Sequence, residues 1–410
     1  MPTANRLLCI SNGHGEDTIA VRILMALRSR LPDLELAALP IVGEGRVFRK
    51  QDIPVIAATK TLPSGGFIYM DSRQLARDLQ GGLVQLTLKQ LQAVKTWALD
   101  GGTVLAVGDL IPMAFAWWSG LPYGVVGTAK SAYYLRDEQG RLVDLPWHAG
   151  WAGSIYLPWE RFFMHHNRCR VVVVRDDLTA QELRALGVSS VYTGNPMMDG
   201  LEPTASIDAL RPPREDALTV VLLPGSRTPE AYANWQVILK CVAAVQRHFQ
   251  PRWVHFLGAI APALDLLELC PLLEAAGWQS LSGHPHPYFQ QGNGSLLLTQ
   301  TAYANCLHLA DTAIAMAGTA TEQFVGLGKP AFITPGQGPQ FTPTFATLQT
   351  RLLGPSLTLV DNPDAMGTAM AQVLKNPDRL TAIHQNGLQR MGTTGAAAAI
   401  ATALTEQLLE

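Results

Sequence analysis

The stretch that decides the fold is Leu218-Thr219-Val220-Val221-Leu222-Leu223-Pro224-Gly225-Ser226-Arg227. Its apolar first part predicts a buried strand, and a helical pattern follows from Glu230 to Val245. A strand, a glycine turn and a helix start form an anion site, because free N–H groups and the helix dipole point at a bound phosphate. The glycine allows close backbone approach, the serine adds a hydroxyl and the arginine adds a fixed charge. We therefore expect a phosphate-binding turn here.

A second turn of this kind is predicted at Gly318-Thr319-Ala320-Thr321-Glu322-Gln323. Two anion-binding turns in one α/β half suggest a ligand with two phosphates. The alternative is that both are ordinary turns, since strand–glycine–helix turns occur throughout doubly wound folds and most bind no phosphate. Neither turn has the G-x-G-x-x-G dinucleotide pattern, and the chain has no G-x-x-x-x-G-K-[ST] phosphate loop.

The composition is that of a globular α/β protein with a large core. The chain has 410 residues, enough for two or three domains, and 48% of them are hydrophobic while 16% are charged. Lys and Arg number 31 against 33 Asp and Glu, so the charge balance gives no reason to expect a nucleic-acid partner. The five cysteines are scattered without a C-x-x-C pair, which predicts a reduced, cytoplasmic chain without a zinc site.

One apolar segment, 103–126, could be mistaken for a membrane span. Pro112, Pro122 and several glycines divide it, whereas a span needs about 20 uninterrupted apolar residues. We predict instead a strand at 104–107, a helix at 113–118 and a strand at 123–126. The N-terminal residues lead straight into a short apolar strand, and no secretory signal is expected.

Strands and helices alternate twice along the chain, which predicts parallel sheets in two similar halves. A polar, proline-rich stretch separates the halves. We predict an N-terminal domain at 1–200, a linker at 201–217, a second domain at 218–385 and a C-terminal helix at 386–410 that packs back on the first domain. Ligands of open α/β sheets bind at the carboxyl ends of the strands, so a site in a cleft between the halves is expected.

Three motifs carry a family resemblance: Thr193-Gly194-Asn195-Pro196-Met197-Met198-Asp199, the run from Leu222 to Arg227, and Ala317-Gly318-Thr319-Ala320 followed by Gly328-Lys329-Pro330. With the two-half layout, the chain resembles the GT-B glycosyltransferases, in particular lipid-A-disaccharide synthase and its relatives in photosynthetic bacteria. Weaker matches are Gly13-His14-Gly15-Glu16-Asp17 and Val107-Gly108-Asp109.

The resemblance implies an α/β GT-B fold, with two Rossmann-like parallel-sheet domains that face a cleft. It implies that the second half binds a nucleotide diphosphate sugar, usually a UDP-sugar, that the first half binds the acceptor, and that transfer inverts the anomeric carbon. Neither a metal nor a cofactor is expected, because the two turns and Arg227 would stabilise the leaving diphosphate.

The chain departs from the family at the position that binds the ribose hydroxyls. The family has Glu seven residues before the proline that matches Pro330, whereas this chain has Gln323 there and Glu322 one residue earlier. A glutamine amide can both donate to and accept from hydroxyls. The family's Leu-Pro-Asn segment is replaced by Leu357-Thr358-Leu359-Val360-Asp361-Asn362. The donor base, the sugar and the acceptor therefore stay open.

Glycosyl transfer of this kind needs a base that removes the proton of the acceptor hydroxyl. Asp109 is the first candidate, because it follows a strand and matches the proposed catalytic Asp of the family; the alternative is that it caps the next helix. His14 and Glu16 follow the first strand in a glycine loop and are further candidates. Their alternative is a plain turn in which Asp17 caps a helix over 18–30.

Three further residues are candidate contacts of the donor. Asn195 ends a strand beside the linker, and Gln337 and Gln340 lie in a loop that follows a strand. Their alternatives are a turn residue and an ordinary surface loop. The pair His284 and His286 lacks a nearby third ligand, so we expect it to be structural rather than metal-binding.

Aromatic residues are concentrated near basic ones between residues 117 and 170. The aromatic residues are Trp117, Trp118, Tyr133, Tyr134, Trp147, Trp151, Tyr156, Trp159, Phe162 and Phe163, and the basic residues are Arg161, His165, His166, Arg168 and Arg170. This combination suits a lipid-like acceptor and peripheral contact with an anionic membrane, and equally a core or homodimer contact. The alternatives to a transferase are a nucleotide-sugar epimerase and a non-catalytic binding protein of the same fold.

Overall fold

The computed structural model describes residues 5–13, 15–57, 83–137, 140, 142–143, 153–203, 207–336, 338 and 341–409. The chain divides into two compact units. Unit 1 comprises Met1–Leu135, Leu142–Asp199 and Thr394–Glu410, and unit 2 comprises Arg136–Arg141 and Gly200–Thr393.

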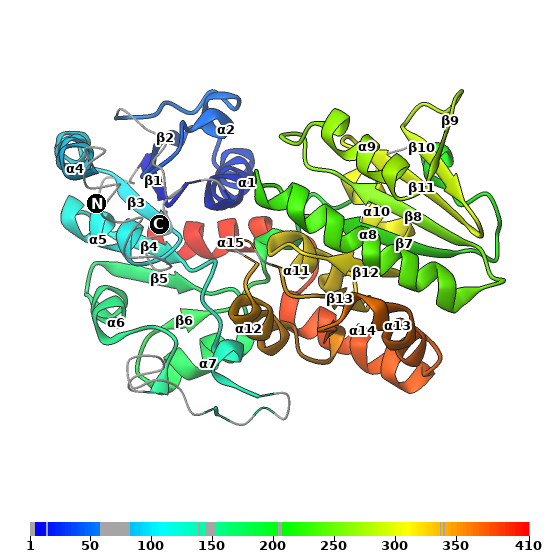
Figure 1. Ribbon diagram of the computed structural model, residues 1–410. Coiled ribbons are helices and arrows are strands. Elements are labelled where there is room, and N and C mark those ends of the chain that lie inside the picture. The colour runs from blue at the N-terminus through cyan, green and yellow to red at the C-terminus, as the bar shows by residue number, and fades with distance from the viewer. Residues whose placement is uncertain are drawn as a thin grey trace. The chain divides into compact units, whose positions relative to one another are not determined.

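Unit 1 is built on a parallel six-stranded sheet of order β2-β1-β3-β4-β5-β6 (Figure 1). The strands are β1 (Arg6–Ser11), β2 (Glu35–Pro40), β3 (Thr103–Val107), β4 (Tyr123–Val126), β5 (Cys169–Val173) and β6 (Ser190–Val191). Since β2 and β3 flank β1, the strand order reverses between β1 and β3. The carboxyl ends of these two strands form the switch point where open α/β sheets bind ligands.

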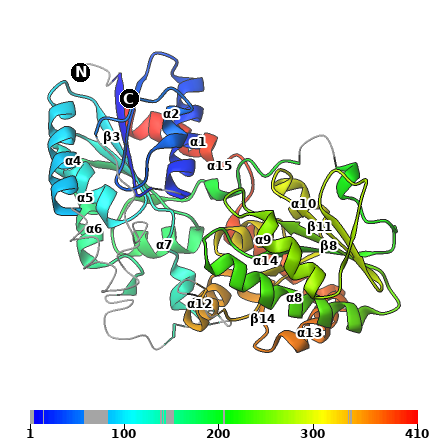
Figure 2. The same ribbon diagram turned by 45° about the horizontal axis from the view of Figure 1, so that its top comes forward.

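Helices cover both faces of this sheet (Figure 2). The helices are α1 (Gly15–Arg30), α2 (Arg46–Arg49), α4 (Leu83–Ala98), α5 (Leu110–Ser119), α6 (Pro158–His165), α7 (Asp177–Ala185) and α15 (Ala396–Leu404). Alternate strand residues point to opposite faces, so that Leu7 and Cys9 pack with α1 and α15 while Leu8 and Ile10 pack with α4, α5, α6 and α7. Burial on both faces explains why these strands read as continuous apolar runs.

The T-G-N-P-M-M-D motif anchors the last helix of the chain to unit 1. The Asp199 carboxylate accepts hydrogen bonds from the backbone N–H groups of Gly395 (2.6 Å), Ala396 (3.1 Å) and Ala397 (2.7 Å). A Cβ on Gly194 would lie 2.8 Å from the Ala396 Cβ, so only glycine permits this packing. The motif therefore caps α15 and packs closely against its first residue. The helix α15 lies beside α1 in both ribbon views.

The prediction of a single C-terminal helix at 386–410 is wrong. The structure has α14 (Pro377–Met391) and α15, and between them Gly392 and Gly395 adopt positive φ values of 73° and 97°. Glycine tolerates this left-handed conformation, so the two glycines break the helix and let the chain pass from one unit to the other.

Unit 2 contains an eight-stranded sheet of order β14-β13-β12-β7-β8-β11-β10-β9. The strands are β7 (Leu218–Leu223), β8 (Val254–Ala259), β9 (Gln279–Leu281), β10 (Tyr288–Gln291), β11 (Gly294–Thr299), β12 (Thr312–Ala315), β13 (Ala331–Ile333) and β14 (Leu357–Leu359). The prediction of a wholly parallel sheet is wrong here, since β10 runs antiparallel to both β11 and β9. The strands β9 and β10 are short, partly polar and at the margin of the sheet. A search of the sequence for apolar runs does not find such strands.

Among the described residues of unit 2, seven helices surround this sheet. They are α8 (Glu230–Phe249), α9 (Leu266–Ala275), α10 (Tyr303–Leu309), α11 (Thr319–Gly326), α12 (Pro343–Leu353), α13 (Met366–Leu374) and α14. The long helix α8 packs against α13 and α9, and α11 packs against α14. The buried face of α8 is mainly apolar, and it carries two polar exceptions, Glu230 and Asn234, in its first turns.

The apolar segment 103–126 folds as β3, α5 and β4, which confirms its predicted division. The helix α5 begins at Leu110, three residues earlier than predicted, because Asp109 caps it. Within the described part of the chain, no helix is both long and apolar enough to cross a membrane. The helix α1 likewise begins before its predicted start, so Asp17 lies in the first turn instead of capping it.

Candidate functional site

In unit 2, the two predicted turns lie side by side at the carboxyl edge of the sheet. The strand β7 pairs with β12 on one side and β8 on the other, so the strand order reverses between β7 and β12. Gly225 follows β7 with φ 95°, and a Cβ there would lie 3.2 Å from the Met316 carbonyl oxygen of the other turn. The structure thus brings the two turns together at the switch point of unit 2.

In the first turn, Ser226 and Arg227 are exposed. The helix α8 begins only at Glu230, so a short loop separates the glycine from the helix start. The buried Glu230 carboxylate accepts a hydrogen bond from the backbone N–H of Phe341 (2.7 Å). The hydroxyl, the guanidinium and the loop backbone are therefore the groups that this turn can offer to an anion.

In the second turn, Gly318 is the N-cap of α11. Because glycine has no side chain, the N-cap residue supplies no side-chain hydrogen bond to the helix start. The Gln349 amide donates to the carbonyl oxygens of Ala317 (3.0 Å) and Gly318 (3.2 Å). These bonds hold the turn through its carbonyl groups. The N–H groups in the first turn of α11 have no intrahelical carbonyl to donate to, so they are the groups that this turn could offer to an anion. Thr319 and Ala320 lie in this first helical turn.

Gln323 and Glu322 are both buried in the first turn and a half of α11. The Gln323 side-chain oxygen accepts a hydrogen bond from the Tyr303 hydroxyl (2.7 Å). Burial raises the pKa of Tyr303, so its hydroxyl stays protonated and keeps donating. This bond orients the Gln323 amide with its oxygen toward Tyr303, which leaves the NH₂ end to face other acceptors.

In unit 1, candidate residues gather at the switch point between β1 and β3. A Cβ on Gly108 would lie 2.9 Å from the Asn12 side chain, so the loops after the two strands touch. Asp109 caps α5 and accepts a long hydrogen bond from the backbone N–H of Ile111 (3.4 Å). The Thr128 hydroxyl, which follows β4, donates to the Glu16 carboxylate (3.5 Å).

Two carboxyl groups at this edge have pKa values raised toward neutrality. Burial, reinforced by the charges of Asp109 and Asp17, raises the pKa of Glu16 to about 7. Burial also raises the pKa of Asp17 to about 6, against the lowering effect of the Ser11 hydroxyl that donates to it (2.6 Å). Glu16 can therefore exchange a proton near neutral pH, as a general acid or base must.

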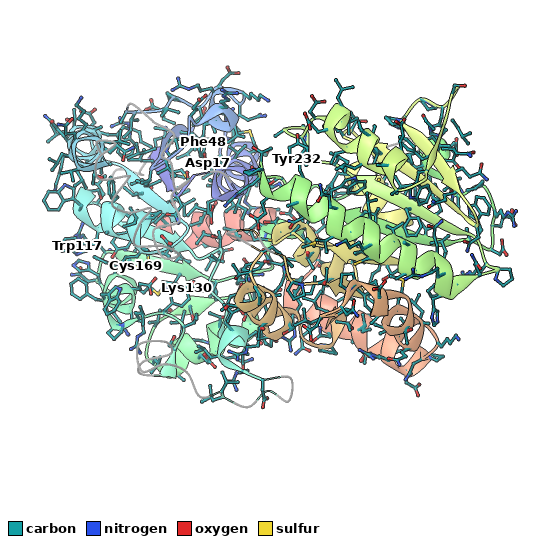
Figure 3. The ribbon with its side chains drawn as sticks, viewed as in Figure 1. Asp17, Phe48, Trp117, Lys130, Cys169 and Tyr232 are labelled. Atoms are coloured by element: carbon teal, nitrogen blue, oxygen red, sulfur yellow. The ribbon has the colours of Figure 1, made fainter. Side chains whose placement is uncertain are left out.

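The sequence analysis missed three charged groups near this edge, of which Arg175 and Glu160 are buried and Lys130 is partly buried. Arg175 follows β5 and its guanidinium donates to the Thr128 carbonyl oxygen (3.4 Å). The Lys130 ammonium, labelled in Figure 3, donates to both oxygens of the fully buried Glu160 (2.7 and 2.5 Å). A charge directly after a run of valines was the available signal for Arg175.

The remaining candidate residues either form hydrogen bonds with the backbone or lie outside the residues that the structure describes. Asn195 is buried and caps a short 3-10 helix, since its side-chain oxygen accepts from the Met197 N–H (3.1 Å). Both ring nitrogens of His284 bond to backbone groups, and no cluster of three metal-ligating side chains occurs among the described residues. His14, Gln337 and Gln340 lie outside the described residues.

The aromatic group predicted between residues 117 and 170 is partly core and partly surface. Tyr156 is buried, whereas Trp118, Trp159 and Phe162 are exposed. Trp117, labelled in Figure 3, packs against Phe162 and other rings of α6, so that α5 and α6 share one aromatic face. Trp147 and Trp151 lie outside the described residues.

Comparisons with known proteins identify the fold. No family model matches the chain. Lipid-A-disaccharide synthase of Syntrophus aciditrophicus (strain SB) is 31% identical over 153 residues, which are 37% of this chain and 36% of the relative. The match therefore spans about a third of the length of that relative.

Three solved structures match over almost the whole chain. They are MurG of Acinetobacter baumannii (TM-score 0.59, 13% identity, 98% of this chain and 99% of that one), the UDP-GlcNAc 2-epimerase of Neisseria meningitidis bound to UDP-GlcNAc (0.55, 12%, 98% and 100%) and the calicheamicin glycosyltransferase CalG4 (0.57, 14%, 100% and 100%). The predicted GT-B fold is confirmed, and it is shared by transferases and epimerases.

Proposed function

We propose that this GT-B protein is a glycosyltransferase that moves a sugar from a nucleotide diphosphate donor, a UDP-sugar, to a lipid-like acceptor with inversion. The observation that carries the proposal is the juxtaposition of the Gly225 and Gly318 turns at the switch point of unit 2. The partial match to a lipid-A-disaccharide synthase supports the transferase class.

Unit 2 would bind the donor. The diphosphate lies against the Gly225 and Gly318 turns, where Arg227 and the N–H groups of Thr319 and Ala320 neutralise the charge that develops on the leaving group. These groups supply positive charge without a metal. Glu322 and Gln323 sit one turn further along α11 and are the proposed contacts of the ribose hydroxyls. Asn195, Gln337 and Gln340 remain proposed contacts of the donor.

Unit 1 would bind the acceptor and remove its proton. Asp109 is the proposed base for the acceptor hydroxyl, whose oxygen attacks the anomeric carbon while the diphosphate leaves with the bonding electrons. Glu16 and His14 are the other proposed catalytic groups. The raised pKa of Glu16 suits a group that takes up the released proton near neutral pH.

The experiment that tests the function combines nucleotide binding with turnover. A ligand that binds the folded state raises the melting temperature, so a panel of nucleotides and nucleotide sugars should give a selective shift with UDP or one UDP-sugar. The same donor is then incubated with lipid extract. Product in lipid supports the transferase. An altered free sugar without acceptor would favour the epimerase, which the Neisseria meningitidis structure makes the second candidate, and binding without any product would favour a non-catalytic protein.

Arg227→Ala should weaken UDP binding by about tenfold or more, because a charge-assisted hydrogen bond to phosphate is worth about 1.5–3 kcal/mol. Isothermal titration with UDP and with uridine measures this effect, and uridine affinity should not change. Arg211→Ala is the matched control, since Arg211 is an exposed arginine of the same unit away from the turns. Unchanged UDP affinity in Arg227→Ala would refute its diphosphate contact.

The aromatic face of α5 and α6 is the proposed site of membrane contact. It exposes Trp118, Trp159 and Phe162, and the exposed Lys95 ammonium lies 5.3 Å from the centre of the Trp118 ring. Aromatic rings beside cations suit the interface of an anionic bilayer. Arg168 is not one of the cations beside this aromatic face, because its guanidinium donates to the carbonyl oxygens of Trp117 and Leu121.

The double substitution of Trp159 and Phe162 by serine should reduce binding to phosphatidylglycerol vesicles by at least about tenfold, since each buried aromatic side chain contributes about 1.5–3 kcal/mol. Vesicle flotation measures it. Leu267→Ser, which removes an exposed apolar residue of α9 in unit 2, should have no effect. Equal flotation of the aromatic variant would exclude this face, and loss of a dimer in light scattering would assign it to self-association instead.

A further inference from the structure

One buried amide on α8 joins the loops of the proposed donor site. The Asn234 Nδ2 group donates to the carbonyl oxygens of Pro224 (3.0 Å) and Met316 (3.3 Å). Pro224 directly precedes Gly225, and Met316 begins the turn that leads to Gly318. An amide NH₂ has two hydrogens, so each one serves a different turn.

The same amide also contacts the loop after β13. A Cβ on Gly336 would lie 3.1 Å from the Asn234 Oδ1 atom and 2.9 Å from the Phe341 carbonyl oxygen, so this backbone packs directly on the amide. The Gly336 N–H donates to the Phe341 carbonyl (3.0 Å), and the Phe341 N–H donates to Glu230, one turn before Asn234 on α8. The loops after the three neighbouring strands β7, β12 and β13 thus all contact the helix α8.

Packing alone does not call for an amide at this position. Asn234 is 3% exposed, and apart from Glu230 one turn earlier, its neighbours on the buried face of α8 are apolar: Ala231, Trp235 and Ile238. Burial of a polar side chain costs free energy unless its hydrogen bonds are made. An apolar residue would fill the space, but it would leave the two carbonyl groups without these donors and the spacing of the turns unconstrained.

We propose that Asn234 is a positioning residue that sets the spacing of the Gly225 and Gly318 turns for a ligand with two phosphates. The inference rests on the proposed function, because it takes both turns as the diphosphate site. A diphosphate spans the backbone of both turns at once, whereas a nucleoside would contact only Glu322 and Gln323, one turn further along α11. Loss of the amide donors therefore weakens diphosphate binding specifically, and leaves nucleoside binding unaffected.

The test is Asn234→Leu, which is close to asparagine in size, removes both donors and adds no charge that would itself repel a diphosphate. UDP affinity should fall about tenfold, the value that corresponds to two lost hydrogen bonds, while uridine affinity stays within about twofold. Titration calorimetry gives both values, so the readout is the ratio of UDP to uridine affinity. A merely structural defect would lower both affinities together.

Gln246→Met is the matched control. Gln246 is also a buried amide of α8, and its Nε2 group donates to the Gln291 carbonyl oxygen (2.9 Å), far along the helix from the turns. The substitution makes the same chemical change and should destabilise the protein without altering the affinity ratio. If Asn234→Leu does not fold, Asn234→Ser removes the same amide donors with a smaller side chain.

The outcomes separate this inference from the function on which it rests. Wild-type protein that binds UDP, with an unchanged affinity ratio in a folded Asn234 variant, overturns the positioning role and leaves the function standing. A ratio that falls equally in Gln246→Met overturns it too. Wild-type protein that binds no nucleoside diphosphate overturns the proposed donor site and the inference together.

Discussion

Asp109→Asn should lower the rate of sugar transfer by about 10²- to 10⁴-fold, the usual contribution of a general base. The variant cannot accept the proton of the acceptor hydroxyl. Its Oδ1 atom can still accept the Ile111 N–H bond that caps α5, and asparagine caps helices as well as aspartate does. Folding and UDP binding should therefore be retained, so that the effect appears in turnover.

Transfer from the donor identified by thermal shift into lipid extract measures this rate. Asp33→Asn, the same substitution at an exposed aspartate of unit 1, is the control and should keep wild-type activity. Wild-type turnover in Asp109→Asn would eliminate it as the base and direct attention to Glu16. A loss of UDP binding along with turnover would mean that Asp109 acts through the structure of the site.

Glu16→Gln should increase the free energy of unfolding at pH 8 by about 2 kcal/mol, because it removes a carboxylate that burial makes costly to ionise. The pKa of Glu16 is raised from its ordinary value of 4.5 to about 7. Between these values the native state binds more protons than the unfolded state, so stability falls as the pH rises through this window. The expected gain in stability is smaller than the raised pKa alone would give, because Glu16 is only partly buried.

Urea unfolding of wild-type and Glu16→Gln at several pH values checks this prediction. The two proteins should have similar stability near pH 4.5 and diverge as the pH approaches 7. Asp17, whose pKa is about 6, should preserve part of the pH dependence in the variant. Glu215→Gln, at an exposed position, should leave the profile unchanged. Parallel profiles for wild type and Glu16→Gln would contradict the raised pKa.

Measured together, the stability and the turnover of Glu16→Gln distinguish a functional carboxylate from a structural one. A stabilising Glu16→Gln that also lowers turnover would indicate that the protein maintains a costly carboxyl group for its chemistry, which is common at active sites. A stabilising change with full turnover would assign the proton exchange near pH 7 to the fold alone.

The strands that hold the proposed donor turns were predictable because their signals are local. The strand β7 lies in the apolar run where a strand is predicted, and β12 and β13 are likewise short apolar runs that end at a turn. Edge strands such as β9 and β10 were not predicted. They depend on partner strands for their hydrogen bonds more than on any apolar pattern of their own.

The sequence by itself determined the alternating elements, the two glycine turns and the positions of Asp109 and Glu16 after their strands, because these features depend on residues a few places apart. Only the tertiary structure decided which groups meet. Asp199 caps a helix that begins almost two hundred residues later, Asn234 joins turns that lie far apart in sequence, and burial beside other carboxylates shifts the pKa of Glu16. Contact and desolvation arise from the folded packing of distant segments, and no local pattern encodes them.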